Sequence, residues 1–346
     1  MSGRNRAWIA AVAIVTIGVL AGSQVGAAGT TIRLATLIPD GSIWDKALKQ
    51  MGDSWRKASE GRVSLRVYPG GVQGDETDVL RKMRIGSLQA GTLTIAGLAE
   101  IDPAFNVLAI PLFFESYDEL FHVLGELRPE LEKRLEDKGY VLVQWGYAGW
   151  VHFFSKRPIH TPDDLKQAKI FVWHGEDQWI GWWRSLGYQP VPLAATDILT
   201  GLKTGMVDTI RTTPLAALSL QWFRETPHMH DLGLGPLTGA TIVSAKTWSK
   251  IDESDQVKLL EAAREMELEL QAEIPGEDKK AVDLMNERGL EVTVTENPEG
   301  WRRLAEDFVQ KMRGDSVPEN IFDRAIAIRD AYRRDLGKQA AAGGSS

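Results

Sequence analysis

Strand and helix patterns alternate along this chain in two runs, which meet at Gly149. Short apolar or alternating stretches are separated by segments whose apolar residues recur at spacings of three and four, the period of a helix. The expected strands of the first run are 32–37, 63–68, 91–95 and 140–145, and those of the second are 151–154, 170–173, 188–191 and 207–210. Repeated strand–helix–strand units predict parallel sheets with right-handed crossovers.

The chain is therefore expected to build one α/β lobe, build a second, and return to the first along a strand at 240–244. Two crossings between lobes define a hinge and a central cleft. Ligands of open α/β sheets bind beyond the carboxyl ends of the strands. We accordingly expect the cleft to be lined by the loops that follow Leu37, Ile95, Trp145, Trp173 and Ile210.

Beyond residue 250 the apolar periodicity predicts mainly helix. A long helix is expected at 252–274, and Pro275-Gly276 is expected to kink or break it. A strand at 290–294 and two helices within 301–336 follow, and 337–346 read as a disordered tail. The expected domains are a first lobe of 28–148 and 240–300, a second lobe of 149–239, and the C-terminal helices.

The first 27 residues have the features of a secretory signal. Arg4 and Arg6 precede an apolar run from Ala7 to Leu20, and small residues lead up to Ala27, near which cleavage is expected. A membrane anchor would need about 20 apolar residues. We therefore expect an exported, periplasmic protein.

Composition and motifs exclude several function classes. A net charge of −7 argues against a nucleic-acid partner, which needs clustered cations. The absence of cysteine excludes thiol catalysis and thiolate metal sites. The sequence has no GxSxG, HExxH or P-loop lysine motif. His228 and His230 share one face of a strand but lack further ligands, so no metal, no cofactor and no enzymatic activity is expected.

Tryptophan is unusually frequent, with 12 residues. Trp179, Trp182 and Trp183 form one aromatic face of an expected helix, which indicates either core packing or a cleft wall. Trp173 ends a strand at the edge where ligands bind, so it is the stronger candidate for the cleft.

Several segments, taken in order, resemble the solute-binding subunit of TRAP transporters, the DctP-type family. They are LATLIPDGSIW at 34–44, VYPGGVQGDETDVLRKMRIGSLQAG at 67–91, IPLFFESYDEL at 110–120, GWVHFFSKRPIHTPDDLKQAKI at 149–170, LGYQPVPLAATDILTGLKTGMVD at 186–208 and SAKTWSKI at 244–251. The resemblance implies a two-lobed binding protein of the periplasmic, type II-like kind, whose long helix after residue 250 spans both lobes.

The resemblance also implies a function and partners. Such a receptor closes on a small ligand and delivers it to the small and large membrane subunits of an ion-driven permease. A relative subgroup with the same substitutions as this chain is associated with a periplasmic TPR-repeat protein, which becomes a candidate partner.

The chain departs from the family at the ligand-binding arginines. The arginine that pairs with a ligand carboxylate in relatives corresponds to Phe171, and a second frequent arginine corresponds to Val151. An apolar wall favours a ligand with apolar or aromatic surface. Arg211 follows a strand at the cleft edge, where it would bind an anionic group of the ligand or an acid across the lobes.

We therefore expect a receptor for a small ligand with substantial apolar or aromatic surface. The alternatives are a conventional carboxylate receptor that uses Arg211, and a sensor or an enzyme on the same scaffold. The candidate ligand-binding residues are Trp44, Glu76, Val151, Phe171, Trp173, Trp179, Arg211, Thr212 and Trp222.

Overall fold

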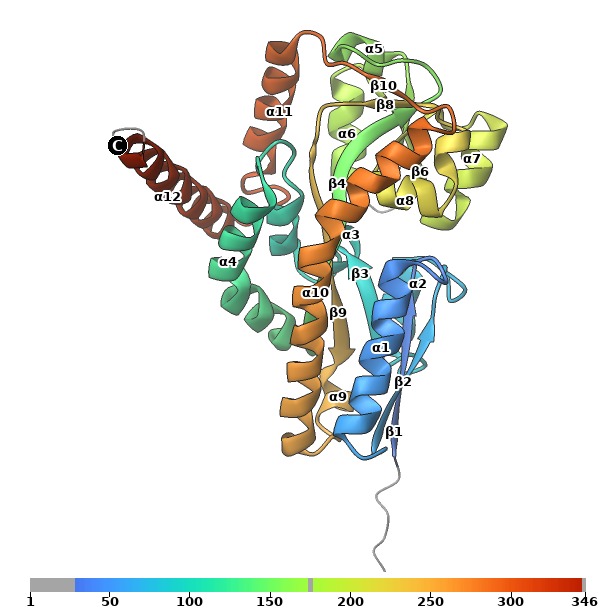
Figure 1. Ribbon diagram of the computed structural model, residues 1–346, viewed down its shortest axis with the longest axis vertical. Coiled ribbons are helices and arrows are strands. Elements are labelled where there is room, and N and C mark those ends of the chain that lie inside the picture. The colour runs from blue at the N-terminus through green and yellow to red at the C-terminus, as the bar shows by residue number, and fades with distance from the viewer. Residues whose placement is uncertain (1–28, 174–176, 344–346) are drawn as a thin grey trace, which may run out of the picture.

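The computed structural model describes residues 29–173 and 177–343, which form two lobes joined by one sheet (Figure 1). The sheet has ten strands with the path β2-β1-β3-β9-β4-β7-β5-β6, while β8 and β10 lie off this path. The predicted two-lobed α/β fold is confirmed. Within 29–173 and 177–343, no helix combines the length and the hydropathy needed to cross a membrane.

The first lobe is built on three parallel strands, β1 (Thr30–Thr36), β2 (Val63–Tyr68) and β3 (Ala90–Thr94). β9 (Gly235–Ser244) runs antiparallel to β3 and joins it to β4 (Tyr140–Ser155). The helical elements of this lobe are α1 (Ile43–Ala58), α2 (Glu76–Arg84), α3 (Ile95–Ala99), the 3-10 helix η1 (Pro103–Ala109), α4 (Tyr117–Asp137) and α9 (Ala245–Trp248). α1 begins after the expected turn, because the Ser42 side chain accepts a hydrogen bond from the Asp45 N–H.

The second lobe is also built on parallel strands, β5 (Lys169–Trp173), β6 (Gln189–Leu193) and β7 (Thr209–Thr212). β7 and β8 (His228–His230) run antiparallel to β4, and β10 (Glu291–Thr293) runs parallel to β8. Its helical elements are α5 (Pro162–Lys166), α6 (Asp177–Ser185), η2 (Ala195–Asp197), α7 (Ile198–Thr204), α8 (Pro214–Ser219) and η3 (Trp222–Arg224). The sheet is therefore mixed, and the prediction of purely parallel pairing was wrong where β4 and β9 take part.

β4 is one strand where the sequence predicted two, at 140–145 and 151–154. Its register with β9 shifts between Tyr147 and Trp150, and Gly149 between them has a φ of 109°. Glycine adopts such a φ readily because it has no Cβ. The small residues around Gly149, which resemble a turn in the sequence, thus form an irregular stretch inside a continuous strand.

α10 (Glu253–Asn286) is a single helix that runs along both lobes (Figure 1). Pro275 lies inside it, so the helix does not end at 274 as expected, and of the two alternatives at Pro275-Gly276 the break is excluded. An interior proline costs about 3 kcal/mol. Buried residues on both sides of it, among them Leu270, Ile274 and Met285, each contribute roughly 1.5–3 kcal/mol of burial and hold the helix together.

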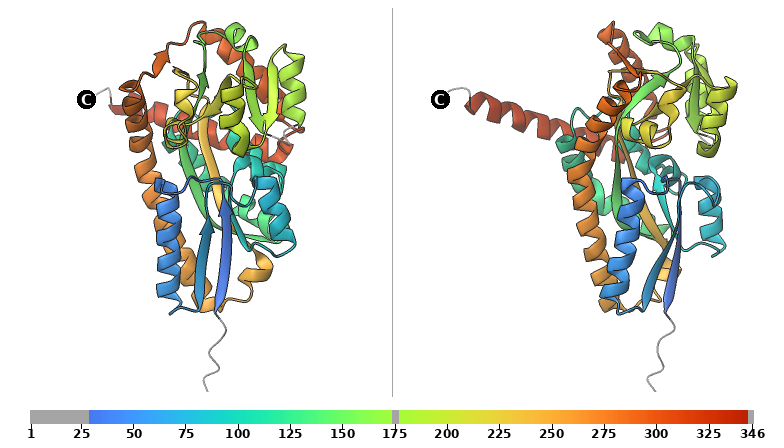
Figure 2. Two further views of the ribbon diagram at one scale, coloured as in Figure 1. Left: turned by 90° about the vertical axis from the view of Figure 1, so that its right-hand side faces the viewer. Right: turned by 45° about the vertical axis from the view of Figure 1, so that its right-hand side comes forward.

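Two helices complete the chain, α11 (Pro298–Met312) and α12 (Glu319–Gly343). α12 packs against α4 and then projects from the body of the protein (Figure 2). It continues to Gly343, so residues 337–343 are helical rather than the expected disordered tail. β10 pairs with β8, which places this strand with the second lobe although it was expected in the first. The other predicted lobe boundaries stay predictions.

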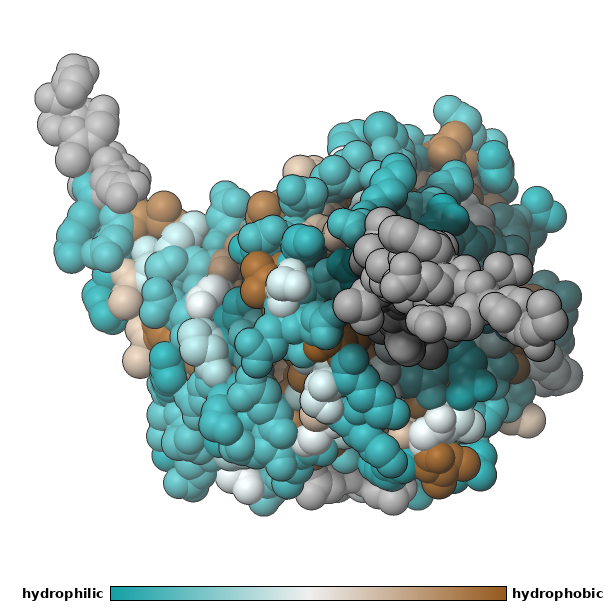
Figure 3. Space-filling model, turned by 90° about the horizontal axis from the view of Figure 1, so that it is seen from below, coloured by the Kyte–Doolittle hydropathy of each residue, from teal (hydrophilic) through white to brown (hydrophobic). Residues whose placement is uncertain are grey.

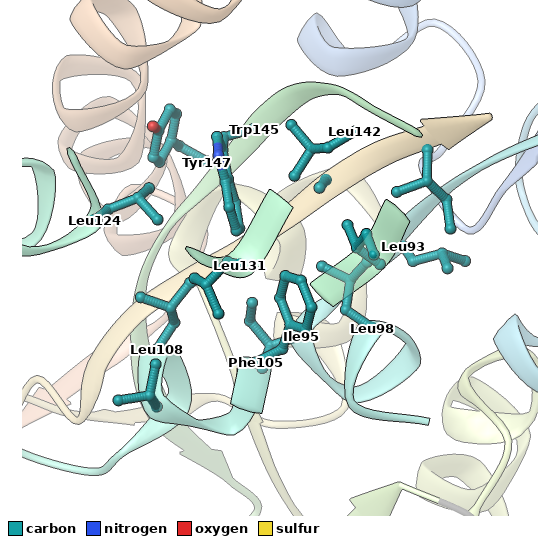
Figure 4. Packing of buried hydrophobic residues seen from close by; sticks show 14 of the residues in the cluster. Leu93, Ile95, Leu98, Phe105, Leu108, Leu124, Leu131, Leu142, Trp145 and Tyr147 are labelled. Carbon is teal, nitrogen blue, oxygen red and sulfur yellow. The ribbon is translucent and has the colours of Figure 1, made fainter. Parts of the chain in front are cut away.

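The larger apolar cluster fills the first lobe between its sheet and helices and continues into the second lobe through Ile170, Val172 and Trp183. Trp145 and Phe105 are fully buried there with ring centroids 6.0 Å apart, and Leu98 and Leu131 pack around them (Figure 4). The outer surface seen from below is largely hydrophilic, with separate hydrophobic residues rather than one continuous patch (Figure 3). The first lobe is thus a rigid base for the residues that face the second.

Pro275→Ala should stabilise the protein, because alanine restores the N–H that a helix interior needs and removes the clash of the proline ring with the preceding turn. We expect the free energy of unfolding to rise by about 1–3 kcal/mol, measured by chemical denaturation. Pro298→Ala is the matched control, since Pro298 lies in the first turn of α11, where proline is tolerated, and should give no comparable gain. A loss of stability in Pro275→Ala would show that packing of the two lobes requires the proline.

Candidate functional site

A cavity of about 500 Å³ lies between the two lobes. Its lining includes Leu37, Ile95, Trp173 and Arg211, each at or next to the end of a strand, and Gly146, which lies inside β4. Four of these five positions agree with the loops that the sequence places around a cleft, so the cavity occupies the expected position. Its size is that of a site for a small molecule.

Eight of the nine candidate residues line this one cavity. They are Trp44, Glu76, Val151, Phe171, Trp173, Arg211, Thr212 and Trp222. The remaining candidate, Trp179, belongs to α6, but its side chain lies outside the described part of the structure.

The wall from the second lobe is formed by residues on neighbouring strands. Phe171 and Trp173 are two residues apart on β5 and therefore share a face of the sheet. Their ring centroids lie 5.3 Å apart in an edge-to-face arrangement. Phe171 is 1% exposed and also packs into the core of the second lobe, so this wall is rigid. Arg211 lies on β7, opposite Phe153 of β4.

The wall from the first lobe contains Trp44 and Glu76. The Trp44 indole donates a hydrogen bond of 2.9 Å to the Tyr147 carbonyl, so its polar atom is satisfied and its ring serves as an apolar surface. The Glu76 carboxylate accepts hydrogen bonds from the N–H and the hydroxyl of Thr94, at 2.6 and 2.8 Å. Thr94 thus fixes the carboxylate at the edge of the cavity.

Charge in the cavity is sparse. Of the described residues that line it, only Glu76 and Arg211 carry charge. Burial raises the pKa of Glu76 to about 7, although the hydrogen bonds from Thr94 act in the opposite direction. Near neutral pH the cavity therefore has one cationic residue and one acid that is only partly ionised, with mostly apolar side chains between them.

Trp182 and Trp183, for which the sequence indicates either core packing or a cleft wall, belong to the core. Trp182 and Trp183 are buried, and the Trp182 ring meets Phe308 of α11 with a centroid distance of 4.0 Å. Trp183 packs edge-on against Tyr188. The aromatic face of α6 that these two residues form therefore attaches α11 to the second lobe.

Sequence reasoning missed several parts of the lining. These are Thr36, Ile38, Thr92, Thr94, residues 108–111, residues 195, 196, 198 and 199, and residues 234–239. The pair Gly235-Pro236, at the point where the chain returns to the first lobe, is a signal that would have indicated the last of them. The other segments carry no pattern that distinguishes a cavity wall from ordinary packing.

The loop at 69–75 of the first lobe touches the second lobe. One Asp75 oxygen accepts the Glu76 N–H at 2.9 Å, and the other accepts the Ala195 N–H of η2 at 3.3 Å. A Cβ on Gly71 would lie 2.8 Å from the Thr196 side chain, closer than such atoms approach. The two lobes are therefore in contact beside the cavity, and that contact requires glycine at position 71.

The histidines of β8 contact residues of other elements. Among the described residues, no group of three or more histidine, cysteine, aspartate or glutamate side chains is arranged to hold a metal ion. The Nδ1 atom of His228 lies 3.4 Å from the Oε2 atom of Glu291, and the His230 ring packs against Trp301.

Comparison with known proteins agrees with this architecture. A solute-binding protein of Roseobacter denitrificans is 27% identical over 260 residues, which cover 72% of this chain and 77% of that protein. The 2,3-diketo-L-gulonate-binding periplasmic protein YiaO of Escherichia coli is 24% identical, over 79% of this chain and 84% of its own. The crystal structure of a TRAP periplasmic solute-binding protein from Sulfitobacter, with bound β-D-galacturonate, superimposes with a TM-score of 0.80 at 21% identity, over 87% of this chain and 100% of that one.

Two lobes with a small-molecule cavity between them are the architecture expected of a solute-binding receptor. The model of the family "Bacterial extracellular solute-binding protein, family 7", also known as DctP, matches residues 34–315, and the chain belongs to that family. The predicted family and the prediction of an extracytoplasmic receptor without enzymatic activity are confirmed.

Glu76→Gln should remove a pH dependence of stability. The raised pKa means that the folded state favours protonated Glu76, so its stabilising contribution is complete below about pH 4.5 and is lost as the pH rises through about 7. Thermal or chemical unfolding of the wild type should reveal a loss of up to about 3 kcal/mol over that range relative to Glu76→Gln. Glu126→Gln on the exposed side of α4 is the control for removing a carboxylate. If the free energies of unfolding of Glu76→Gln and of wild type differ by the same amount at all pH values, burial does not raise the pKa of Glu76.

Gly71→Ala should oppose contact between the lobes. Gly70 and Gly71 have φ values of 67° and 71°, so alanine costs roughly 1 kcal/mol of backbone strain at either position. Only Gly71 faces Thr196, whereas a Cβ at Gly70 meets open space. Gly70→Ala is therefore the matched control.

The separation of the lobes can be measured by electron spin resonance between labels on Lys57→Cys and Lys203→Cys, both exposed, because the chain has no cysteine of its own. Gly71→Ala should lengthen the mean distance and Gly70→Ala should not. Equal label-to-label distances in the two variants would show that the contact with Thr196 does not limit how closely the two lobes approach.

Proposed function

We propose that this protein is the receptor subunit of a TRAP-type secondary transporter, and that its ligand is a small monocarboxylate with substantial apolar or aromatic surface. The observation that carries the proposal is the wall formed by Val151, Phe171 and Trp173 around a cavity whose lining cation is Arg211. In this proposal Trp44, Trp173 and Trp222 contact the apolar body, while Arg211 and Thr212 orient the carboxylate.

Magnitudes favour such a ligand over a dianion. Covering about 150–250 Å² of aromatic surface contributes roughly 4–6 kcal/mol at about 25 cal/mol per Å². A second carboxylate would lie in a cavity whose other charged lining residue is the acid Glu76, and a buried charge that lacks its partner costs about 3–5 kcal/mol. The apolar contribution and the electrostatic penalty therefore both favour a monocarboxylate with apolar surface over a dianion.

The relatives support the carboxylate part of the proposal. YiaO of Escherichia coli is named for 2,3-diketo-L-gulonate, and the Sulfitobacter protein holds β-D-galacturonate. Both compounds carry one carboxylate, which Arg211 would bind in this chain by charge-assisted hydrogen bonds.

A polyhydroxylated sugar acid is the second candidate ligand. Thr92, Thr94, Thr212 and Thr238 line the cavity, and their hydroxyl groups can both donate and accept hydrogen bonds. This alternative keeps Arg211 as the carboxylate partner and differs in the body of the ligand. Binding measurements separate the two candidates.

The proposal includes the steps around ligand capture. The first 27 residues would be removed near Ala27 on export, the lobes would close about a hinge, and the loaded receptor would dock on small and large membrane subunits. A periplasmic TPR-repeat protein is a further proposed partner. Neighbouring genes for both permease subunits would favour transport over a sensor function, and mass spectrometry of the exported protein would locate the cleavage site.

Binding should be measured by isothermal titration calorimetry with phenylacetate, hexanoate, D-galacturonate and succinate. We expect phenylacetate or hexanoate to bind most tightly. Arg211→Gln should weaken that binding by about 10- to 100-fold, because it removes hydrogen bonds between charged groups.

Arg184→Gln, an exposed arginine of α6 that does not line the cavity, is the control and should leave the affinity unchanged. Tightest binding of D-galacturonate would favour the second candidate, and tightest binding of succinate would contradict both. Native mass spectrometry of the purified protein, compared with Phe171→Arg, would detect a co-purified apolar compound directly.

A further inference from the structure

Asp278 of α10 connects the long helix to two other elements through a single carboxylate. One oxygen accepts the Trp150 N–H of β4 at 2.8 Å, and the other accepts the Leu215 N–H of α8 at 3.0 Å. The residue is 7% exposed, and α10 packs against both β4 and α8. These two hydrogen bonds join three elements that are far apart in the sequence.

Both partners of Asp278 stand beside residues that line the cavity. Trp150 precedes Val151, at the place where the register of β4 with β9 shifts. Leu215 lies in the first turn of α8, between the lining residues Thr212 and Ala216. Asp278 itself does not line the cavity, so it acts on the lining through the backbone of its neighbours.

The space around the carboxylate is closely fitted. Gly149, with its φ of 109°, brings the backbone so near that a Cβ would lie 2.6 Å from an Asp278 oxygen. A larger residue at position 149 would displace the carboxylate from the Trp150 N–H. The glycine in the irregular stretch of β4 and the aspartate on α10 therefore form one fitted unit.

We propose that Asp278 is a positioning residue for ligand binding, which holds β4 and α8 in the register that shapes the cavity and which releases part of that restraint when it is protonated. This inference rests on the proposed role of the cavity as the ligand site. An ionised carboxylate offers an acceptor to each of the two N–H groups. The protonated form, like asparagine, has one full acceptor and leaves the second N–H less well satisfied.

The surroundings of Asp278 set the pH range. Burial raises the pKa of Asp278 to about 6, while the two N–H donors act in the opposite direction. α4 contributes the half-buried Tyr117, whose pKa is raised by burial and by the Asp278 charge, whereas the Trp150 and Leu215 groups are backbone amides. The charged neighbours on α10 pair with each other on its exposed side, Glu277 with Lys280 and Lys279 with Asp283. The restraint should therefore be complete above about pH 7 and weaken as the pH falls through about 6.

The test uses the ligand-free protein with ¹⁵N-labelled tryptophan and leucine. The amide resonances of Trp150 and Leu215 should move together in nuclear magnetic resonance spectra, with one midpoint near the pKa of Asp278, about 6. In Asp278→Asn that common midpoint should disappear. Hydrogen exchange of residues 213–221 in this variant at pH 7.5 should be about tenfold faster than in wild type, the effect of losing one hydrogen bond.

Two comparisons make the result decisive. Tyr117→Phe removes the neighbouring hydroxyl but keeps both hydrogen bonds of Asp278, so exchange of 213–221 should stay as in wild type. Exchange of β1 and β2 reports whether Asp278→Asn is folded. Unchanged exchange of 213–221 in a folded Asp278→Asn, or a persistent common midpoint, would overturn the inference. Because no ligand is used, failure of the proposed ligand class would not affect this result.

Discussion

The antiparallel pairing of β4 with β9 is the interaction on which the rest of the structure depends. β9 bonds to β3 along one edge and to β4 along the other, so it closes the sheet of the first lobe. β4 then continues into the second lobe, where β7 and β8 pair with its far end. A backbone ladder shared in this way keeps the lobes in one sheet while the irregular stretch around Gly149 lets its two halves differ in direction.

α10 supports the same connection from outside the sheet. It contacts α1 in the first lobe, β4 at the crossover and α8 in the second lobe. Its buried acids are satisfied by groups from other elements. Glu267 pairs with Arg128 of α4 and accepts the Trp145 N–H, while Asp278 accepts two N–H groups near the cavity. The helix therefore fixes each lobe by polar contacts as well as by apolar packing.

Local patterns in the sequence were enough to predict most elements and the position of the cleft. Apolar and alternating stretches located β2 and β5 within one residue, and the rule for the carboxyl ends of strands located the cavity. Long-range pairing was not predictable in this way. Nothing local shows that residues 146–149 extend along β9, or that burial on both sides of Pro275 outweighs the cost of the proline.

Prediction of the candidate site from the sequence was limited in the same way, because local patterns do not show long-range contacts. Trp173 and Arg211 could be selected because they lie at or next to the end of a strand, and Phe171 because it takes the place of the family's ligand-binding arginine. Thr94 could not, because its role arises from a contact with Glu76 that no spacing encodes. Trp182 and Trp183 were ambiguous for a physical reason, since an aromatic helix face looks the same whether it covers a ligand or another helix.

The contact of Asp75 and Gly71 with residues 195–196 has a kinetic consequence. If separation of the lobes at this contact is the slow step of release, the time that a bound molecule spends in the protein is governed by the rate of opening as much as by its own contacts. Compounds of quite different affinity would then depart at similar rates. In the proposed transporter, a membrane subunit that holds both lobes apart would then hasten release of the ligand without touching it.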